Sequence, residues 1–435
     1  MKGKAFNTKS FTEKGWLKLD NAAKLFPAII SKDLTSVFRI SASLNSPVKY
    51  SVLKEAVAIT SKRFPYFSVS LGSGLFWHFL DFNERPPRIQ VEEKIPCTAF
   101  ALSRKDEPLY RIILKGNRIS AEFIHILTDG GGALEYLKSL LYTYLTLIGR
   151  QPGSPGNIIL PGTPISEEEL EDGYNKYFHK LPPPTRLVRS WHLPFRVNDR
   201  PRLRIIRGEI NVNEILELTH KLNVSLTEYL ASVYLFSLQG IFVSGNGKKG
   251  SHKRKVLRIE VPVNMRNKLP SRTMRNFSLF VSPELDLRLG TYTFEEVLLS
   301  VHHQLQISSE IKQISRFLSS NVGYEKLLIV RIMPLFIKEM AIAAIYRGLA
   351  AKRFTGVMTN LGLVTLPETM SELVEAFELI SPPPNPKVKV GCALISYKNK
   401  LRITFSNITQ SPELERRFFK HLTEAGIHVR ILNYN

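Results

Sequence analysis

Residues 125–132, HILTDGGG, place one histidine, one aspartate and three glycines together. A histidine at the end of an apolar run can act as a general base, because its unperturbed pKa lies near neutrality. Asp129 can hold the local turn, and Gly130–Gly132 allow positive φ or the close approach of another element. The alternative interpretation of these residues is a histidine in the core, followed by a glycine-rich turn. The pattern H-x-x-x-D-G therefore needs support from the rest of the chain.

The segments around this stretch predict how it is held. The apolar runs on either side of Gly116-Asn117 predict a β-hairpin whose second strand leads to His125. Beyond the glycines, apolar residues recur at helical spacing, which predicts a helix starting near Ala133. The sequence thus predicts a strand that ends at His125, then a corner, then a helix.

Helical and strand-like segments are mixed throughout the 435 residues, which predicts a mixed α/β (α+β) protein. A stretch rich in proline, glycine and charge, roughly residues 151–200, predicts a linker between two halves. We expect an N-terminal lobe over residues 1–175 and a C-terminal lobe over residues 176–435.

Local signals predict several helix starts. Capping boxes at Ser225–Glu228 and Thr293–Glu296 predict two of them. Ser46-Pro47 predicts a third, with serine as the cap and proline in the first turn.

The chain is strongly basic, with 60 Lys and Arg against 38 Asp and Glu and a formal charge of +22. This excess favours acidic or phosphate-bearing partners. The densest basic stretches, 180–207 and 248–255, lack the interleaved aromatics of a nucleic-acid module, so we expect no nucleic-acid partner. Residues 245–250 match G-x-G-x-x-G, but a helical pattern precedes them and a charged loop follows, which predicts a surface loop.

Cys97 and Cys392 are the only cysteines, too few for a disulfide framework or a metal knot. The basic N-terminus has no apolar segment typical of a signal peptide. These features predict a metal-free, cytoplasmic protein. The most apolar later stretch, 327–351, is interrupted by a proline and three basic residues and stays below the roughly 18 apolar residues of a membrane span. We expect a buried helix pair there, with weak peripheral membrane contact as the alternative.

Four further segments stand in a fixed order with the histidine motif. They are WLKLDNAAKLFP at 16–27, PVNMR at 262–266, Asn276-Phe277, and TNLG at 359–362. Together with His125–Gly130 they resemble the alcohol acetyltransferase-like branch of the acyltransferase superfamily that includes chloramphenicol acetyltransferase and non-ribosomal peptide condensation domains. The resemblance covers most of the chain.

The resemblance implies two lobes with a channel between them. It implies that His125 is the general base, removing a proton from a hydroxyl or amine that attacks an acyl thioester. It makes Asp129 a structural residue paired with an arginine, for which Arg266 is the candidate. Candidates for lining the channel are Gly130, Asn264, Arg266, Asn276 and Asn360. For the asparagines, plain roles in turns and strand ends are an equal interpretation.

The implied co-substrate is acyl-CoA or acyl-phosphopantetheine, with no permanently bound cofactor, and the implied acceptor is a small alcohol or amine. The positive charge suits the phosphates of CoA or an acidic acyl carrier protein. Many family members carry two adjacent histidines, and this chain has Ile124 in place of the first, which disfavours a peptide-bond-forming domain. Carrier-protein-dependent condensation-type transfer and a non-catalytic binding protein with the same fold are the alternatives.

Overall fold

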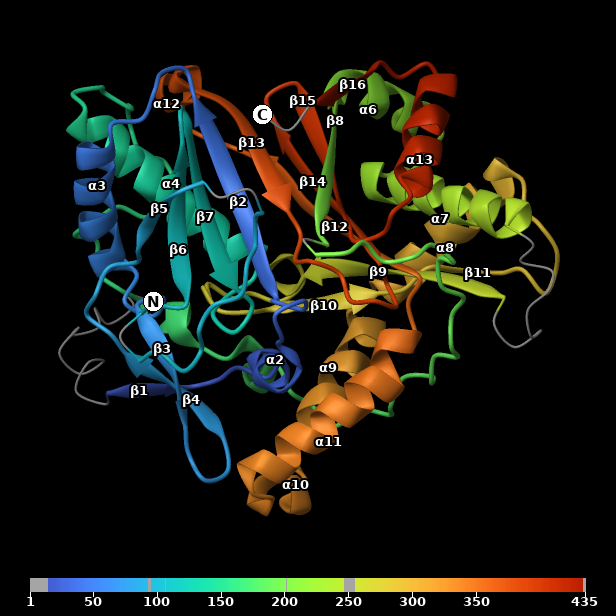
Figure 1. Cartoon of the computed structure of the whole chain (residues 1–435), viewed down its shortest axis with the longest axis horizontal. Coiled ribbons are helices and arrows are strands. Elements are labelled where there is room, and N and C mark those ends of the chain that lie inside the picture. The colour runs from blue at the N-terminus through green and yellow to red at the C-terminus, as the bar shows by residue number, and fades with distance from the viewer. Residues whose placement is uncertain (1–14, 93–94, 106, 201, 246–254, 433–435) are drawn as a thin grey trace.

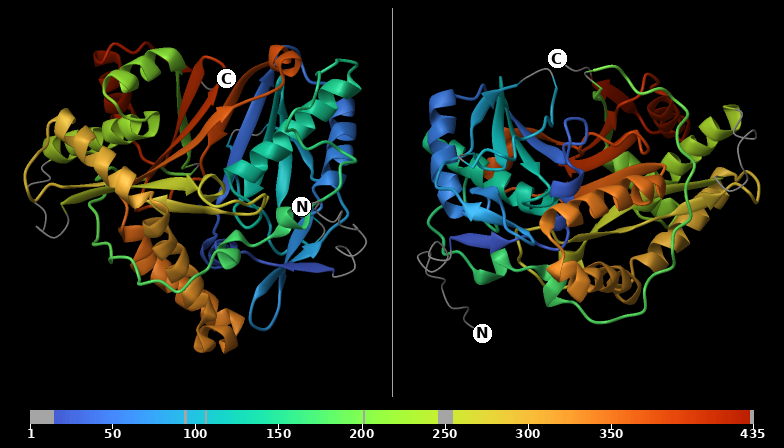
Figure 2. Two further views of the ribbon diagram at one scale, coloured as in Figure 1. Left: turned by 180° about the vertical axis from the view of Figure 1, so that it is seen from behind. Right: turned by 60° about the horizontal axis from the view of Figure 1, so that its bottom comes forward.

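The computed structural model describes residues 15–92, 95–105, 107–200, 202–245 and 255–432. Helices and sheets form two lobes side by side, and a group of helices projects from the base (Figure 1). Figure 2 shows the same arrangement from behind and from below. The predicted mixed α/β class is confirmed.

The N-terminal lobe is built on a five-stranded sheet of order β13-β2-β7-β6-β5, in which only β5 runs parallel to its neighbour. Helix α4 packs on β2 and β7, and α3 packs on α4. A small sheet, β1-β4-β3, lies below them (Figure 1). The elements are β1 (Trp16–Lys18), η1 (Ala23–Leu25), α2 (Phe26–Ile29), β2 (Val37–Leu44), α3 (Tyr50–Arg63), β3 (Val69–Ser73), β4 (His78–Phe82), β5 (Ile89–Val91), β6 (Tyr110–Lys115), β7 (Arg118–Ile124), α4 (Gly130–Leu147) and β13 (Val374–Ile380).

The C-terminal lobe has a larger sheet of order β10-β9-β12-β14-β15-β8-β16, with β11 also paired to β9. Its strands are β8 (Arg204–Asn211), β9 (Val256–Asn264), β10 (Ser278–Val281), β11 (Glu284–Asp286), β12 (Gly356–Val364), β14 (Val390–Tyr397), β15 (Lys400–Asn407) and β16 (Val429–Leu432). Its helices, with the short ones of the connections, are η2 (Glu167–Leu170), α5 (Gly173–Lys176), α6 (Val212–Lys221), α7 (Leu226–Ser244), η5 (Met265–Asn267), α8 (Phe294–Ser308), α9 (Ile311–Lys326), α10 (Leu328–Ile332), α11 (Leu335–Gly348), η6 (Ala350–Lys352), α12 (Glu368–Leu373) and α13 (Glu413–Glu424).

Helix α7 is the centre of the second core. It is long and apolar enough to cross a membrane, yet 72% of its apolar window is buried inside the protein. It packs against α8, α13 and β9. We therefore describe α7 as a core helix of the C-terminal lobe.

One strand crosses the lobe boundary that the sequence predicts between residues 175 and 176. β13 pairs antiparallel with β2, from Val374 opposite Leu44 to Ile380 opposite Arg39. The C-terminal half thus completes the N-terminal sheet. The boundary itself stays a prediction.

Of the helix starts predicted from the sequence, some are confirmed and others are wrong. Both predicted capping boxes are formed, and at Ser225 the two reciprocal hydrogen bonds measure 2.7 and 3.2 Å. The predicted serine cap at Ser46 is wrong, because α3 begins at Tyr50 and Lys49 occupies the N-cap position without a side-chain bond. The corner helix begins at Gly130 rather than near Ala133. Most of the glycine-rich stretch 245–250 lies outside the described residues.

The prediction of a buried helix pair at residues 327–351 is wrong. No residue of α10 is buried, and Lys338 is the buried residue of α11. Together with α9 these helices form the projection at the base of the molecule (Figure 1). Apolar composition indicated a core position, whereas the fold leaves much of this apolar face in contact with solvent.

Candidate active site

His125 follows the last residue of β7 and is held by aromatic rings. Its backbone N–H donates to the Ser36 carbonyl at 3.0 Å. The Phe26 ring of α2 stacks on the imidazole at a centroid distance of 5.4 Å and an interplanar angle of 16°. The Phe38 ring of β2 lies at 4.6 Å and 31°. The imidazole plane is therefore fixed by two different elements of the N-terminal lobe.

The protonation of the His125 ring follows from its hydrogen bond. Nδ1 lies 3.2 Å from the Thr128 carbonyl oxygen, which can only accept, so Nδ1 carries the proton and Nε2 the lone pair. Burial lowers the pKa of His125 below 6.5, although the charge of Asp129 and the Thr128 bond raise it. The Asn276 side chain also raises the pKa of His125, but burial outweighs it. A neutral imidazole can accept a proton near pH 7.

Asp129 holds the corner between β7 and α4. Its Oδ1 accepts from the backbone N–H groups of Gly131 at 3.1 Å and Gly132 at 3.3 Å, which caps the helix. Its Oδ2 accepts from the Phe277 N–H at 2.8 Å and from Arg266 Nη1 at 2.8 Å. Burial raises the pKa of Asp129, but the charge and hydrogen bonds of its partners outweigh this and lower it. These contacts hold the carboxylate in place between α4 and the C-terminal lobe.

Arg266 is in contact with Asp129, as the sequence analysis anticipates, and it also ties its own loop together. Nε donates to the Thr273 carbonyl at 2.9 Å, and Nη2 donates to the Arg275 carbonyl. Nη1 lies 3.2 Å from Asn264 Oδ1. One guanidinium therefore fixes a C-terminal-lobe loop onto the first turn of α4.

Asn276 connects the same loop to His125. Its buried side chain donates to the His125 carbonyl at 2.9 Å and to Asp20 Oδ2 at 3.1 Å. Asp20 is fully buried, accepts from the Ala23 N–H at 2.8 Å, and lies 3.7 Å from Arg275 Nε. Burial raises the pKa of Asp20 to about 6, against the opposing charge of Arg275. Asn276 thus positions the backbone of His125.

Asp20 is a positioning residue that the sequence analysis did not single out. The signal was present, because Asp20 lies inside the segment WLKLDNAAKLFP that carries part of the resemblance. Its partner Asn276 is 256 residues away along the chain, so no local pattern connects the two.

The three glycines serve close packing. The expected freedom to take positive φ is not used, because Gly130–Gly132 form the first turn of α4 and none of them has a positive φ. A Cβ atom on Gly132 would lie 2.3 Å from both the Met274 carbonyl oxygen and Thr128 Oγ1. A Cβ on Gly130 would meet only the end of the Leu361 side chain, at 3.0 Å. Glycine is therefore required where the two lobes touch at residue 132.

Asn264 and Asn360 have visible structural roles. Asn264 is exposed and caps η5 by accepting from the Arg266 N–H at 3.1 Å. Asn360 stands at an irregularity of β12, donates to Thr227 Oγ1 at 3.0 Å and accepts from the Gly362 N–H at 2.9 Å. Contact of Gly130 and these asparagines with a substrate stays a prediction.

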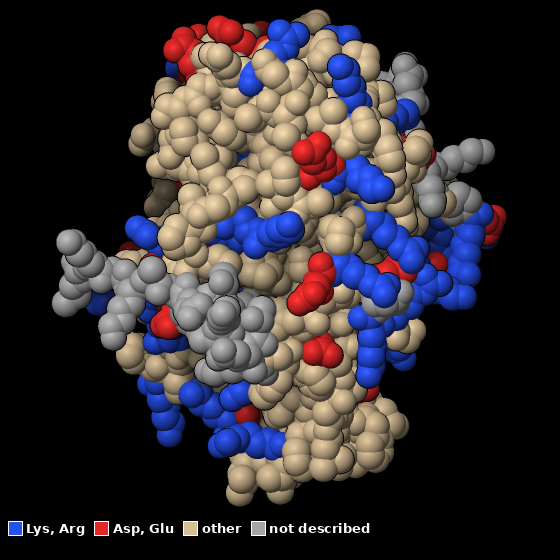
Figure 3. Space-filling model, turned by 90° about the vertical axis from the view of Figure 1, so that its left-hand side faces the viewer, with Lys and Arg blue, Asp and Glu red and all other residues tan. Residues whose placement is uncertain are grey.

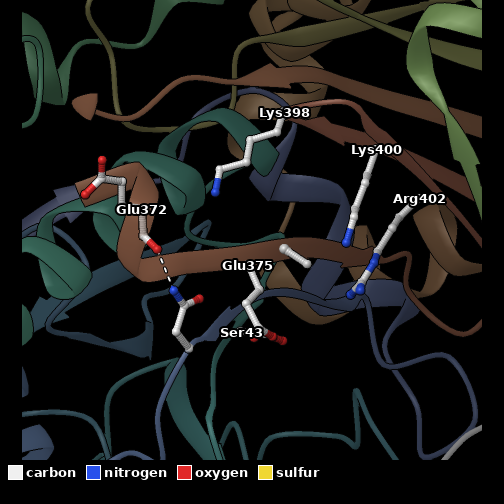
Figure 4. A pocket seen from close by; sticks show the side chains of 8 residues that line it. Ser43, Glu372, Glu375, Lys398, Lys400 and Arg402 are labelled. Atoms are coloured by element: carbon white, nitrogen blue, oxygen red, sulfur yellow. Dashed lines mark hydrogen bonds between the residues drawn. The ribbon is translucent and has the colours of Figure 1, made fainter. Parts of the chain in front are cut away.

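A separate open cleft of about 450 Å³ lies away from His125 (Figure 4). Ser43, in its wall, pairs with Arg118 at the start of β7, whereas His125 follows the other end of that strand. The lining residues are Ser43, Asn45, Glu372, Glu375, Ala376, Lys398, Lys400 and Arg402. This cleft therefore does not belong to the histidine site. Among the described residues, no group of three or more His, Cys, Asp or Glu side chains is placed to hold a metal.

The sequence and the structure can be compared with those of known proteins. No protein-family model matches the sequence, and no curated protein matches it. The first condensation domain of the calcium-dependent antibiotic synthetase, in complex with a substrate analogue, is similar in structure, with a TM-score of 0.63, 13% identity, and coverage of 96% of this chain and 99% of that one. The chain therefore has the two-lobed fold of this condensation domain, and the predicted fold is confirmed.

Two further solved structures share this fold. TRI101 from F. sporotrichioides, complexed with coenzyme A and T-2, has a TM-score of 0.61 and 11% identity over 96% of this chain and 100% of that one. The wax ester synthase/diacylglycerol acyltransferase from Marinobacter aquaeolei has a TM-score of 0.52 and 15% identity over 94% of this chain and 100% of that one. At sequence identities this low, the similarity shows the fold alone.

Proposed function

We propose that this protein is an acyltransferase that moves an acyl group from a thioester donor to the hydroxyl or amine of a small acceptor. The observation that carries the proposal is the placement of His125, whose Nδ1 lies 3.2 Å from the Thr128 carbonyl oxygen and whose pKa is lowered by burial. It lies in a fold whose solved examples include a condensation domain and a wax ester synthase/diacylglycerol acyltransferase.

In the proposed reaction, His125 Nε2 takes the proton of the acceptor O–H or N–H as the acceptor attacks the thioester carbonyl. The new C–O or C–N bond gives a tetrahedral oxyanion. This intermediate collapses with cleavage of the C–S bond, and the thiolate leaves and takes the proton back from Nε2. Phe26 and Phe38 support the step by keeping the imidazole neutral and fixed in its plane, and Asp129 and Arg266 support it by holding the corner.

We propose acyl-CoA as the donor. The formal charge of +22 suits the phosphates of CoA, and the similar TRI101 structure was solved with coenzyme A. The similarity to a condensation domain favours one second candidate, a phosphopantetheine arm on an acidic carrier protein. We propose a cytoplasmic location, which the unpaired, buried Cys97 and Cys392 support.

The test is release of free thiol from a panel of acyl-CoA donors, and of carrier-bound donors, with a panel of alcohol and amine acceptors. We expect acceptor-dependent release that falls about 10²- to 10⁴-fold in His125→Ala, the usual contribution of a general base. His303→Ala is the matched control, because His303 is exposed on α8 in the other lobe. Full turnover by His125→Ala would refute the mechanism. A chain that binds donor without releasing thiol would be the non-catalytic protein.

A further inference from the structure

Helices α10 and α11 expose large apolar side chains over a short stretch of chain. A soluble monomer rarely exposes a contiguous apolar patch larger than a few hundred Å², and larger patches mark interaction sites. We call this the α10–α11 surface. Its most exposed members are Leu328 (71%), Ile329 (66%), Ile332 (59%), Phe336 (65%) and Met340 (70%).

The α10–α11 surface is bordered by unneutralised cations. Lys326, Arg331 and Arg347 are exposed, and the described residues offer none of them an ion pair. The acidic residues of α9–α11 are Glu325 and Glu339, and both are already engaged by basic side chains of the N-terminal lobe. Figure 3 shows that Lys and Arg also outnumber acidic side chains on a neighbouring face, around a largely uncharged lower part. The surface therefore combines apolar side chains with net positive charge.

We propose that the α10–α11 surface docks this protein onto an anionic lipid bilayer. The interface of a bilayer accepts apolar side chains at the boundary between headgroups and acyl chains, while its anionic headgroups attract nearby Lys and Arg. The surface projects from the base of the molecule, a shape that fits a planar membrane (Figure 1). A second copy fits less well, because a symmetric contact would place Arg331 and its neighbours against the same cations.

The surface is firmly attached to the body of the protein. The buried Lys338 of α11 donates to the Phe76 carbonyl at 2.7 Å and lies 3.2 Å from the centroid of the Trp77 ring. At the start of α11, the Leu335 N–H donates to the Leu75 carbonyl at 2.9 Å. The Leu75 side chain is 72% exposed and extends the apolar area onto the β3–β4 turn. Two lobes therefore contribute to one docking face.

Helix α2 lies between this face and the candidate active site. Helix α11 packs against α2, which carries Phe26, and Phe26 stacks on His125. If the proposed function holds, docking brings the acyl-transfer site to amphiphilic substrates held in the membrane. Docking itself does not depend on catalysis, so the membrane-docking proposal and the proposed acyl-transfer function can be refuted independently.

The test is co-sedimentation of the full chain with phosphatidylcholine vesicles, with and without phosphatidylserine. We expect binding that requires phosphatidylserine, weakens as salt is added, and falls at least about tenfold in the double variant Leu328→Ser/Ile329→Ser. Arg331→Gln should weaken it about fivefold, the effect of one cation near an anionic surface. Leu289→Ser is the matched control, because Leu289 is 81% exposed after β11, in a different part of the C-terminal lobe (Figure 1). His125→Ala should bind like the unmodified chain.

Thermal unfolding midpoints check that each variant is folded. The side chains changed on the surface, at Leu328, Ile329, Arg331 and Leu289, are all exposed. Equal vesicle binding by the double variant and the unmodified chain would overturn the proposal. So would absence of binding to either vesicle. A dimer in sedimentation equilibrium that the double variant abolishes, without vesicle binding, would identify the surface as a contact between copies and also overturn it.

Discussion

Alanine at two neighbouring glycines should have opposite consequences. A Cβ at Gly132 would approach the Met274 carbonyl and Thr128 Oγ1 to 2.3 Å, and these two atoms share a hydrogen bond of 2.6 Å. Overpacking of this kind costs about 1–3 kcal/mol, and losing the hydrogen bond costs about 1 kcal/mol. Alanine favours the helical conformation over glycine by up to about 1 kcal/mol, which offsets part of this cost. Gly132→Ala should therefore lower the free energy of unfolding by about 2 kcal/mol.

Gly130→Ala is the matched control in the same helical turn. Its Cβ would meet only Leu361 Cδ1, the end of a side chain that can move, so the change should stay within about 0.5 kcal/mol or stabilise the protein. Urea unfolding followed by tryptophan fluorescence measures both variants, with the shift in midpoint multiplied by the common slope. Equal midpoints for the two variants would refute the argument that close approach of the lobes requires glycine at residue 132.

Two further predictions concern charge. Because burial lowers the pKa of His125, turnover should rise with pH along an acid limb whose midpoint lies below 6.5, and a midpoint above 6.5 in kcat/KM against pH would contradict this. Asp129→Asn should cost about 3–5 kcal/mol near neutral pH, because it leaves Arg266 without its buried anion. The lowered pKa of Asp129 means that its carboxylate stabilises the fold above the unfolded value of 3.8, and that this is lost as the pH falls through the folded value. The deficit of Asp129→Asn in urea unfolding should therefore shrink in acid, and a deficit independent of pH would speak against the ion pair.

The parts of the fold that the sequence predicted are those decided by nearby residues. The hairpin at Gly116-Asn117 and the capping box at Ser225 depend on hydrogen bonds between neighbours, and both are present. The position of His125 after a strand followed from the same hairpin. The ordered motifs added the two-lobed fold, which is confirmed by the solved structures.

The parts that sequence reasoning missed depend on distant partners. Nothing local indicates that β13 adds to β2, or that Asp20 holds Asn276 against the His125 carbonyl. The reason for glycine at residue 132 is the Met274 carbonyl, 142 positions later. The exposure of α10 was missed for a different reason. Apolar residues at helical spacing occur both in a core helix and in a surface helix that binds a partner, so the sequence pattern does not distinguish the two.

The corner around His125 belongs to both lobes, and this limits how the protein can move. The segment Met274–Phe277 of the C-terminal lobe makes three of its contacts there: Thr128 binds the Met274 carbonyl, Asp129 binds the Phe277 N–H, and Asn276 binds the His125 carbonyl. Opening of the lobes at this point would break these three hydrogen bonds and separate Arg266 from Asp129. An opening that keeps them would have to occur elsewhere between the lobes. For the same reason, an isolated N-terminal lobe would lose the Asn276 hydrogen bond to the His125 carbonyl, together with the strand β13 that completes its sheet.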